Sequence, residues 1–511
     1  MMAAHDYIIS EGKLVICRLL GTFSTTSEIY IFRRCRSSCN LTMWLSVVVL
    51  VHVLLLISNS VESQSIIDTL PGFPGKLPFK LETGYIGVGE LDEVQLFYYF
   101  IESERNPKDD PLVLWLTGGP GCSGLSGLLF EIGPFTFDYA NSSGNKPTLE
   151  LNPYSWTKIA NIIFLDAPVG TGFSYATTWE AYNINDTSST AQTYEFLRKW
   201  LMAHSTFLVN PLYIAGDSYS GKTVPIIVQE VSNGNEIGHW PPLNLKGFVI
   251  GNPLTHEIWD TNARLKFAHR TALISDRLYQ STKRNCQGSY INPDPNNTQC
   301  VEDLREVNEC IANIYIAQIL EPNCAYSQPP KPNKLWSLSP HLDDDNFIDI
   351  LHSTPDQVLE PWCRCYNYVY SLIWANDKSV QKALHIREGT ITDWERCNNT
   401  LTYTHNIITS IDYHRNLTKK DLRALVYSGD HDMSIPYVGT LEWIELLDLS
   451  VKDDWRPWFV DGQIAGYVTI YTEEKYSLTF TTIKGAGHTA PEYKPKECLA
   501  MIDRWFAYYF L

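Results

Sequence analysis

The sequence contains no block of basic residues, and this absence excludes one large class of function. The chain has 57 acidic and 40 basic residues, which give a formal net charge of −17 over 511 residues. Proteins that bind nucleic acid neutralise its phosphates with clustered Lys and Arg. We therefore expect no nucleic-acid partner, and an acidic balance of this kind mainly keeps a secreted protein soluble.

Metal and nucleotide motifs are also missing. Cys363 and Cys365 are too close together for the usual zinc-ligand spacing, and no paired His follows them. The Gly-rich run 118–124 has no Lys-Ser/Thr at its end, which a phosphate-binding loop requires. The sequence therefore predicts no metal ion and no cofactor.

The apolar run 44–57 is too short to span a membrane comfortably. It follows Arg33, Arg34 and Arg36 and precedes the small, polar stretch 58–63, which is the pattern of a secretory signal peptide. We expect cleavage rather than a stable membrane anchor, with a signal anchor as the alternative.

The predicted domains follow from this signal. Residues 1–42 have the character of an upstream extension, and Met43 is a plausible start. Residues 1–63 are then an N-terminal extension and signal peptide that is removed, and residues 64–511 form one catalytic domain.

Among the segments present, the most informative is 216–221, Gly-Asp-Ser-Tyr-Ser-Gly. It follows the apolar run 212–215 and precedes the helix-like run 222–228, so a strand turns sharply into a helix around Ser218. Small neighbours permit a strained backbone that exposes the Ser hydroxyl. Ser218 is the candidate nucleophile, and the alternative is an ordinary strand–helix turn.

Two later strands end in a loop with acids and in a loop with one His. The segment 425–432 reads as a buried strand that ends in a loop with Asp430 and Asp432, and the segment 478–488 reads as a strand that ends in a Gly-rich loop with His488. The chain order Ser, Asp, His is that of α/β-hydrolases. A Ser hydroxyl needs a neutral imidazole to take its proton, and a carboxylate fixes the imidazole tautomer. On this pattern, Asp432 or Asp430 fills the third role.

A fourth predicted strand leads into a loop that can stabilise a negatively charged oxygen. The apolar run 111–117 leads into Gly118-Gly119-Pro120 of the Gly-rich run. Acyl transfer develops a negative oxygen that backbone N–H groups must meet. We expect the N–H groups of Gly119 and Tyr219 to form this oxyanion hole. The alternative is a tight turn that carries a disulfide Cys.

At this point the chain resembles a known family. The segments WLTGGPGCSG, GDSYSG, YSGDHD and KGAGHTAPEYKP resemble the signature blocks of serine carboxypeptidases and their plant acyltransferase relatives, and the resemblance runs from about residue 70 to the C-terminus. It implies a triad of Ser218, Asp432 and His488.

The fold class expected is α/β, an α/β-hydrolase fold with a mostly parallel central sheet, helices on both faces and a helical cap insertion. Strand-like and helix-like runs alternate from about 66 to 255 and resume at about 375. Residues at about 256–370 differ and are assigned to the cap. The Pro-rich loop 327–334 is predicted to be exposed to nicking. Some relatives are cut there into disulfide-linked chains, so the same maturation is a hypothesis for this chain.

Departures from the peptidase pattern favour the acyltransferase branch. Peptidases of the family typically carry Asn at the position of Thr117 and Glu at that of Asp217, and with a Glu matching Glu131 these bind a peptide's terminal carboxylate. Losing one partner weakens such discrimination. We predict substrate binding by Thr117, Gly118, Asp217 and Glu131.

Three hypotheses follow from the resemblance. The first is an acyltransferase that moves an acyl group from a 1-O-acyl glucose ester to an alcohol or amine acceptor. The second is a serine carboxypeptidase that acts on peptides. The third is a catalytically silent, secreted binding protein. The partners are therefore a small-molecule donor and acceptor, or a peptide.

Cysteines and sequons fit an oxidising secretory compartment, extracellular or vacuolar. By resemblance Cys122 pairs with Cys397, and Cys286 and Cys300 form a local pair. The partners of Cys310, Cys324, Cys363 and Cys365 cannot be deduced from sequence, and Cys498 is the candidate odd thiol. Predicted glycosylation sites are Asn141, Asn185, Asn296, Asn398 and Asn416.

Overall fold

The computed structural model describes residues 7–10, 13–16, 64–142, 147–322, 364 and 367–511. The chain divides into two units, Met1–Glu62 and Ser63–Leu511. In the first unit, β1 (Tyr7–Ser10) and β2 (Lys13–Ile16) form an antiparallel hairpin. The predicted signal peptide lies outside the described residues and stays a prediction. None of the described helices is long and apolar enough to cross a bilayer.

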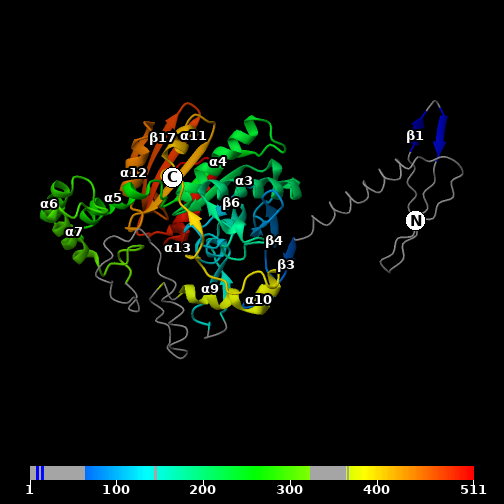
Figure 1. Ribbon diagram of the computed structural model, residues 1–511, viewed down its shortest axis with the longest axis horizontal. Helices are drawn as coiled ribbons and strands as arrows, with labels where there is room; N and C mark the ends of the chain where they lie inside the picture. The colour runs from blue at the N-terminus through cyan, green and yellow to red at the C-terminus, as the bar shows by residue number, and fades with distance from the viewer. Residues whose placement is uncertain (1–6, 11–12, 17–63, 143–146, 323–363, 365–366) are drawn as a thin grey trace. The chain divides into compact units, whose positions relative to one another are not determined.

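A twelve-stranded sheet forms the centre of the second unit (Figure 1). Across the sheet the order is β16 (Ser450–Val460), β17 (Gln463–Glu473), β18 (Tyr476–Ile483), β15 (Arg423–Gly429), β13 (Leu245–Gly251), β12 (Leu212–Asp217), β6 (Leu112–Leu116), β9 (Asn161–Leu165), β5 (Val94–Ile101), β4 (Leu81–Val88) and β3 (Ser65–Ile67), while β10 (Tyr175–Ala176) pairs with β5. The strands from β18 to β9 are parallel, and the flanking pairs are antiparallel.

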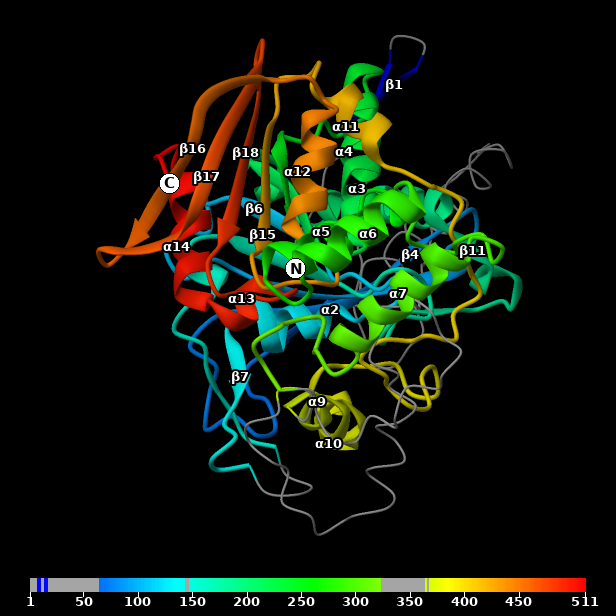
Figure 2. The ribbon, with the colours of Figure 1, turned by 90° about the vertical axis from the view of Figure 1, so that its left-hand side faces the viewer.

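Helices cover both faces because the central strands are apolar on both sides, as parallel strands usually are. Along β6, Trp115 packs into one apolar core while its neighbour Leu114 packs into the other. The first core includes residues of α9 (Asn367–Asn376), α10 (Lys378–Ala383) and α14 (Pro495–Phe506). The second core includes residues of α3 (Asp186–Ala203), α4 (Ser220–Glu236), α11 (Ile411–Leu417) and α12 (Tyr437–Glu445). Figure 2 shows α14 and α12 on opposite sides of the orange strands. The fold class expected from the sequence is confirmed.

The described part of the predicted cap is helical. After β13 the chain forms α5 (Glu257–Arg270), α6 (Asp276–Cys286) and α7 (Thr298–Ile311), which are green in Figure 1. These three helices form a separate apolar cluster with Met433 and Val438. The loop 327–334, proposed from the sequence as a nicking site, lies outside the described residues.

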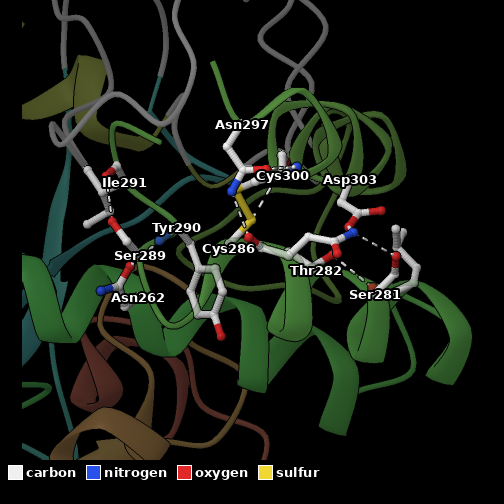
Figure 3. The surroundings of a disulfide bond; sticks show 12 residues. Asn262, Ser281, Thr282, Cys286, Ser289, Tyr290, Ile291, Asn297, Cys300 and Asp303 are labelled. Atoms are coloured by element: carbon white, nitrogen blue, oxygen red, sulfur yellow. Dashed lines mark hydrogen bonds between the residues drawn. A yellow bond between two sulfur atoms is a disulfide. The ribbon is translucent and has the colours of Figure 1, made fainter. Parts of the chain in front are cut away.

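A disulfide between Cys286 and Cys300 joins the end of α6 to the first turn of α7 (Figure 3). The side chain of Asn297 caps α7 by accepting the N–H of Cys300 at 3.2 Å. The Tyr290 N–H donates to the Asn262 side chain at 3.0 Å and ties this corner to α5. Closing a loop of this length stabilises a fold by about 3 kcal/mol in the chain-entropy model, so the small cap does not depend on its apolar contacts alone.

The imidazole of His414 is buried against the second core without a polar partner among the described residues. His414 in α11 is fully buried and stacks on Trp443 with ring centroids 4.6 Å apart. Neither ring nitrogen has a hydrogen-bond partner among the described residues. Burial lowers the pKa of His414 from its ordinary 6.5 to about 3. The native state therefore holds this imidazole neutral.

From the lowered pKa of His414 we predict that the folded protein loses stability in acid. Because the folded pKa lies below the unfolded value, the contribution of His414 is fully present above pH 6.5 and is lost as the pH falls toward 3. The loss is about 2 kcal/mol at pH 5. We expect His414→Phe to flatten the dependence of the unfolding free energy on pH in this window, measured by urea denaturation. The exposed His239, changed to Phe, is the control and should leave the slope unchanged. An unchanged slope in His414→Phe contradicts the assignment.

Candidate active site

The backbone turns sharply at Ser218, between the end of β12 and the start of α4. Ser218 has a φ of 54°, a conformation that disfavours residues with a Cβ by about 1–2 kcal/mol. Two hydrogen bonds join it to the end of β13 and the loop that follows: its N–H donates to the Gly251 carbonyl at 2.9 Å, and its carbonyl accepts the N–H of Leu254 at 2.8 Å. Gly251 ends β13 and Leu254 lies three residues further on, so the neighbouring strand and its loop maintain the strained turn.

The structure brings the three candidate catalytic residues together from the ends of β12, β15 and β18. The Oγ of Ser218 lies 2.9 Å from Nε2 of His488. The Nδ1 of His488 lies 2.8 Å from Oδ2 of Asp432. In this geometry Nδ1 donates its proton to the carboxylate, which leaves Nε2 as the acceptor for the Ser hydroxyl.

The geometry also separates the two acids that the sequence pattern left open. Asp432 contacts His488, whereas Asp430 accepts the N–H of Gly485 at 2.7 Å and braces the base of the His loop. Asp432 is fully buried. Its other donors are the Asn252 side chain at 2.8 Å and the N–H groups of Ser434 at 2.7 Å and Ile435 at 3.2 Å.

Electrostatics make His488 a stronger base than a free imidazole. Burial opposes its protonated form, but the charge and hydrogen bond of Asp432 outweigh burial, and the negative charge of Asp217 adds to them. The pKa of His488 is therefore raised above its ordinary value of 6.5. This arrangement can take the Ser218 proton and hold the resulting imidazolium.

The Gly-rich loop after β6 approaches Ser218 as closely as glycine permits. A methyl group on Gly118 would lie 2.6 Å from the Cβ of Ser218 and 3.0 Å from the backbone nitrogen of Tyr219. Gly119 has a φ of 119°, which side-chain-bearing residues rarely adopt. The two loops that carry the predicted oxyanion donors, Gly119 and Tyr219, thus meet beside the candidate nucleophile. Their role in binding an oxyanion stays a prediction.

A disulfide between Cys122 and Cys397 braces this loop. The two chains also pair through backbone bonds, Asn398 N–H to the Gly121 carbonyl at 2.9 Å and Ser123 N–H to the Arg396 carbonyl at 2.8 Å. Both cysteines line the adjacent pocket, so the bond fixes a pocket wall as well as the loop.

Beside Ser218 lies a pocket of about 270 Å³. All four predicted substrate-binding residues line it. The full lining is Thr117, Gly118, Gly119, Cys122, Glu131, Asp217, Ser218, Ile314, Tyr315, Ile316, Ala317, Tyr368, Arg396, Cys397, His488, Thr489 and Tyr493.

Asp217 and Glu131 are buried carboxyl groups of the pocket, and the pKa of each is raised. Burial raises the pKa of Asp217 to about 6, although the charge on His488 and the Gly118 N–H, 3.1 Å away, oppose the rise. Burial and the nearby charges of Asp217 and Glu492 raise the pKa of Glu131 well above its ordinary value. Like charges this close resist double ionisation, so the pair retains a proton in mild acid.

Several pocket residues have no counterpart in the sequence predictions. Tyr315, Tyr368 and Tyr493 form an aromatic wall, and the guanidinium of Arg396 lies 4.3 Å from the ring centroid of Tyr368. The Tyr368 hydroxyl donates to Glu492 at 2.9 Å. Tyr493 and Glu492 belong to the segment that carries His488. Tyr315 and Tyr368 come from segments without a motif, so no local signal indicates them.

The five asparagines predicted as glycosylation sites differ in their exposure. Asn141, Asn296 and Asn416 are exposed, whereas Asn185 and Asn398 are half-buried.

The cysteines outside the two disulfides differ in burial. Cys498 is a buried free thiol, and Cys310 is an exposed thiol without a disulfide partner among the described residues. Cys324, Cys363 and Cys365 lie outside that part of the chain. Within the described ranges, no group of three or more His, Cys, Asp or Glu side chains is placed to hold a metal ion.

This fold, with a Ser, an Asp and a His after the ends of three parallel strands of one sheet, defines the class of α/β-hydrolases. Within that class the chain belongs to the serine carboxypeptidase family, whose family model matches residues 71–508. The resemblance found in the sequence motifs is confirmed.

The relatives cover nearly the whole chain. Serine carboxypeptidase-like 1 of Arabidopsis thaliana is 49% identical over 460 residues, which cover 90% of this chain and 96% of that protein. Serine carboxypeptidase-like 7 of the same organism is 46% identical over 462 residues, or 90% of this chain and 98% of that protein. Among solved structures, the prohormone-processing carboxypeptidase KEX1 of Saccharomyces cerevisiae has a TM-score of 0.67 and 20% identity, and the match covers 88% of this chain and 96% of that one. This last likeness shows the fold.

The hydrogen-bond geometry predicts different roles for Asp432 and Asp430. In Asp432→Asn the amide no longer enforces the required His488 tautomer, and we expect kcat to fall by about 10³- to 10⁴-fold. Asp430→Asn keeps an oxygen that accepts the Gly485 N–H, and its kcat should fall by less than about tenfold. Hydrolysis of p-nitrophenyl acetate measures kcat, and circular dichroism checks the fold. A larger loss in Asp430→Asn would reverse the assignment.

Proposed function

We propose that this protein is a secreted acyltransferase that moves an acyl group from a 1-O-acyl glucose ester to an alcohol or amine acceptor. Family membership supports an enzyme of the serine carboxypeptidase type. The choice of acyl transfer rests on the pocket beside Ser218, and within it on Thr117 and Asp217.

The chemistry of these two side chains supports a donor without a terminal carboxylate. Thr117 offers one hydroxyl where peptidases of the family typically offer an amide, and its Oγ1 is buried without a hydrogen-bond partner among the described residues. One oxygen of Asp217 already accepts the Gly118 N–H. A site that binds a peptide carboxylate needs paired donors, and replacing one of them lowers its discrimination.

The proposed reaction proceeds through an acyl-enzyme. Ser218 Oγ attacks the carbonyl carbon of the donor while His488 Nε2 takes the hydroxyl proton, and the negative oxygen lies against the N–H groups of Gly119 and Tyr219. His488 then returns the proton to the glucose oxygen as the ester bond breaks.

In the second half the acceptor replaces glucose. Its hydroxyl or amine gives a proton to His488, attacks the acyl carbon and leaves as the new ester or amide when Ser218 recovers its proton. Water in the same position gives hydrolysis. Orientation of a bound acceptor is the physical means of excluding that outcome, since effective molarities of oriented groups reach about 10⁵ M or more.

A carboxypeptidase is the second candidate, and the buried acid pair favours it. With the pKa of Asp217 raised to about 6 by burial, Asp217 and Glu131 retain a proton in mild acid. A protonated carboxyl group can donate a hydrogen bond to a carboxylate, and the corresponding residues of the peptidases bind the terminal carboxylate of a peptide.

The oxidising compartment proposed for the protein is the secretory pathway, with the extracellular space or vacuole as its end point. The disulfides Cys122–Cys397 and Cys286–Cys300 are of the kind that persists there.

One experiment tests the proposed function against its alternatives. The purified protein is offered a 1-O-acyl glucose with and without alcohol or amine acceptors, and separately a blocked dipeptide. We expect acceptor-dependent formation of a new ester or amide, quantified by mass spectrometry, and loss of at least about 10³-fold in rate in Ser218→Ala. Release of the C-terminal amino acid alone contradicts acyl transfer and supports the peptidase. Activity retained in Ser218→Ala contradicts both.

The acid pair gives a second, independent test through pH. As the pH rises through about 6, Asp217 loses its proton and becomes negative, because burial has raised its pKa to about 6. A peptide carboxylate is then repelled, and its KM should rise between pH 5 and 7. An uncharged glucose ester feels no such repulsion, and we expect its KM to change by less than about twofold. A parallel rise for both substrates would mean that the donor also binds the protonated acids.

A further inference from the structure

A short segment of the cap lies between the two loops that carry His488 and Asp432. This segment, residues 314–319, follows α7 and is called the strap here. Four of its residues, Ile314, Tyr315, Ile316 and Ala317, line the pocket beside Ser218. The strap is therefore positioned to affect both the substrate and the catalytic loops.

On one side the strap binds the His488 loop. The backbone N–H of His488 donates to the carbonyl of Ala317 at 2.8 Å. The side chain of Gln318, which is 4% exposed, donates through Nε2 to the carbonyl of Gly485 at 3.1 Å. Its Oε1 accepts the N–H of Leu320 at 3.2 Å, which fixes the side chain from its other end.

On the other side the strap binds the Asp432 loop. The carbonyl of Ile316 accepts the N–H of Met433 at 2.8 Å and that of Ser434 at 3.1 Å. The N–H of Ile319 donates to the carbonyl of His431 at 3.1 Å. The Ser434 N–H also donates to Asp432 Oδ1 at 2.7 Å, so one donor links the strap to the catalytic carboxylate.

The strap packs tightly against Gly487, the residue that precedes His488. A methyl group on Gly487 would lie 2.3 Å from the carbonyl oxygen of Ala317 and 2.9 Å from the Cβ of Gln318. Gly487 does not have a positive φ, so close packing, against the strap and against the Tyr493 ring at 2.9 Å, is what requires glycine here rather than backbone conformation.

We propose that the strap sets the separation of the His488 and Asp432 loops and that Gln318 is its positioning residue. The inference rests on the proposed function, because it takes Ser218, His488 and Asp432 as the reacting groups. The strap's own bonds are mostly from its backbone, and the Gln318 amide is the side-chain contact through which it holds the Gly485–Gly487 turn. Displacement of a catalytic group by about 1 Å costs up to about 10²-fold in rate.

The test measures phosphonylation of Ser218, without glucose ester or acceptor. A fluorophosphonate probe phosphonylates the nucleophile: the serine oxygen bonds to phosphorus, fluoride leaves, and His488 takes the hydroxyl proton. In Gln318→Leu we expect the second-order rate constant to fall by about 10- to 100-fold. For p-nitrophenyl acetate we expect kcat to fall by a similar factor while KM changes by less than about twofold, since the pocket lining is retained.

A matched control separates positioning from a general loss of stability. Gln381 in α10 is also buried and donates through its side chain to a backbone carbonyl, that of Ala375 in α9, at 3.1 Å. Gln381→Leu loses the same kind of hydrogen bond, in a place that holds α9 rather than either catalytic loop. Its rate of phosphonylation should stay within about twofold of the original protein.

Gly487→Ala is the second variant, because it moves the strap without removing the Gln318 bond. Phosphonylation should be slower in Gly487→Ala than in the unaltered protein. This variant tests the positioning role if Gln318→Leu does not fold. Unchanged rates in the folded variants, or an equal loss in Gln381→Leu, overturn the positioning role. If the unaltered protein is not labelled at Ser218, the proposed function itself fails.

Discussion

The buried charge of Asp432 is the constraint on which the rest of the site depends. A carboxylate without solvent exposure is costly unless donors surround it. Those donors come from separate parts of the fold: Asn252 after β13, the backbone of Ser434 and Ile435, and His488 after β18. Satisfying one buried charge therefore fixes the relative positions of three loops, and the imidazole that faces Ser218 is held as a consequence.

The order of strands supplies the geometry for this convergence. Because β18, β15, β13, β12 and β6 are adjacent and parallel, their carboxyl ends lie along one edge of the sheet. His488, Asp432, Asn252, Ser218 and Gly118 each follow one of these strands. The same edge carries Asp217, whose charge raises the pKa of His488 while His488 opposes the rise in the pKa of Asp217. The strength of the base and the charge of the pocket are thus coupled.

Residues in short motifs at strand ends were predictable from the sequence, and this includes Ser218, His488 and the Gly118-Gly119 pair. The strand-and-loop pattern left Asp432 and Asp430 open, because two acids in one loop satisfy it equally. The resemblance to the family implied Asp432, and the path of the loop is what brings that residue to the imidazole. Tyr315 and Tyr368 were missed for a different reason. Tyr315 follows α7 in the cap and Tyr368 belongs to α9, neither of them within a motif, and only the packing of these two segments brings them to the pocket.

The sequence by itself determined the class of chemistry, since a strained Ser turn, a His loop and a Gly-rich loop are each local arrangements that a few adjacent residues encode. It also determined the alternation of apolar runs that produces a sheet covered on both faces. Only the tertiary structure decided how these loops are held at hydrogen-bonding distance. That information lies in contacts between residues far apart in the chain, such as Ala317 with His488 and Asn252 with Asp432, which no local pattern can specify.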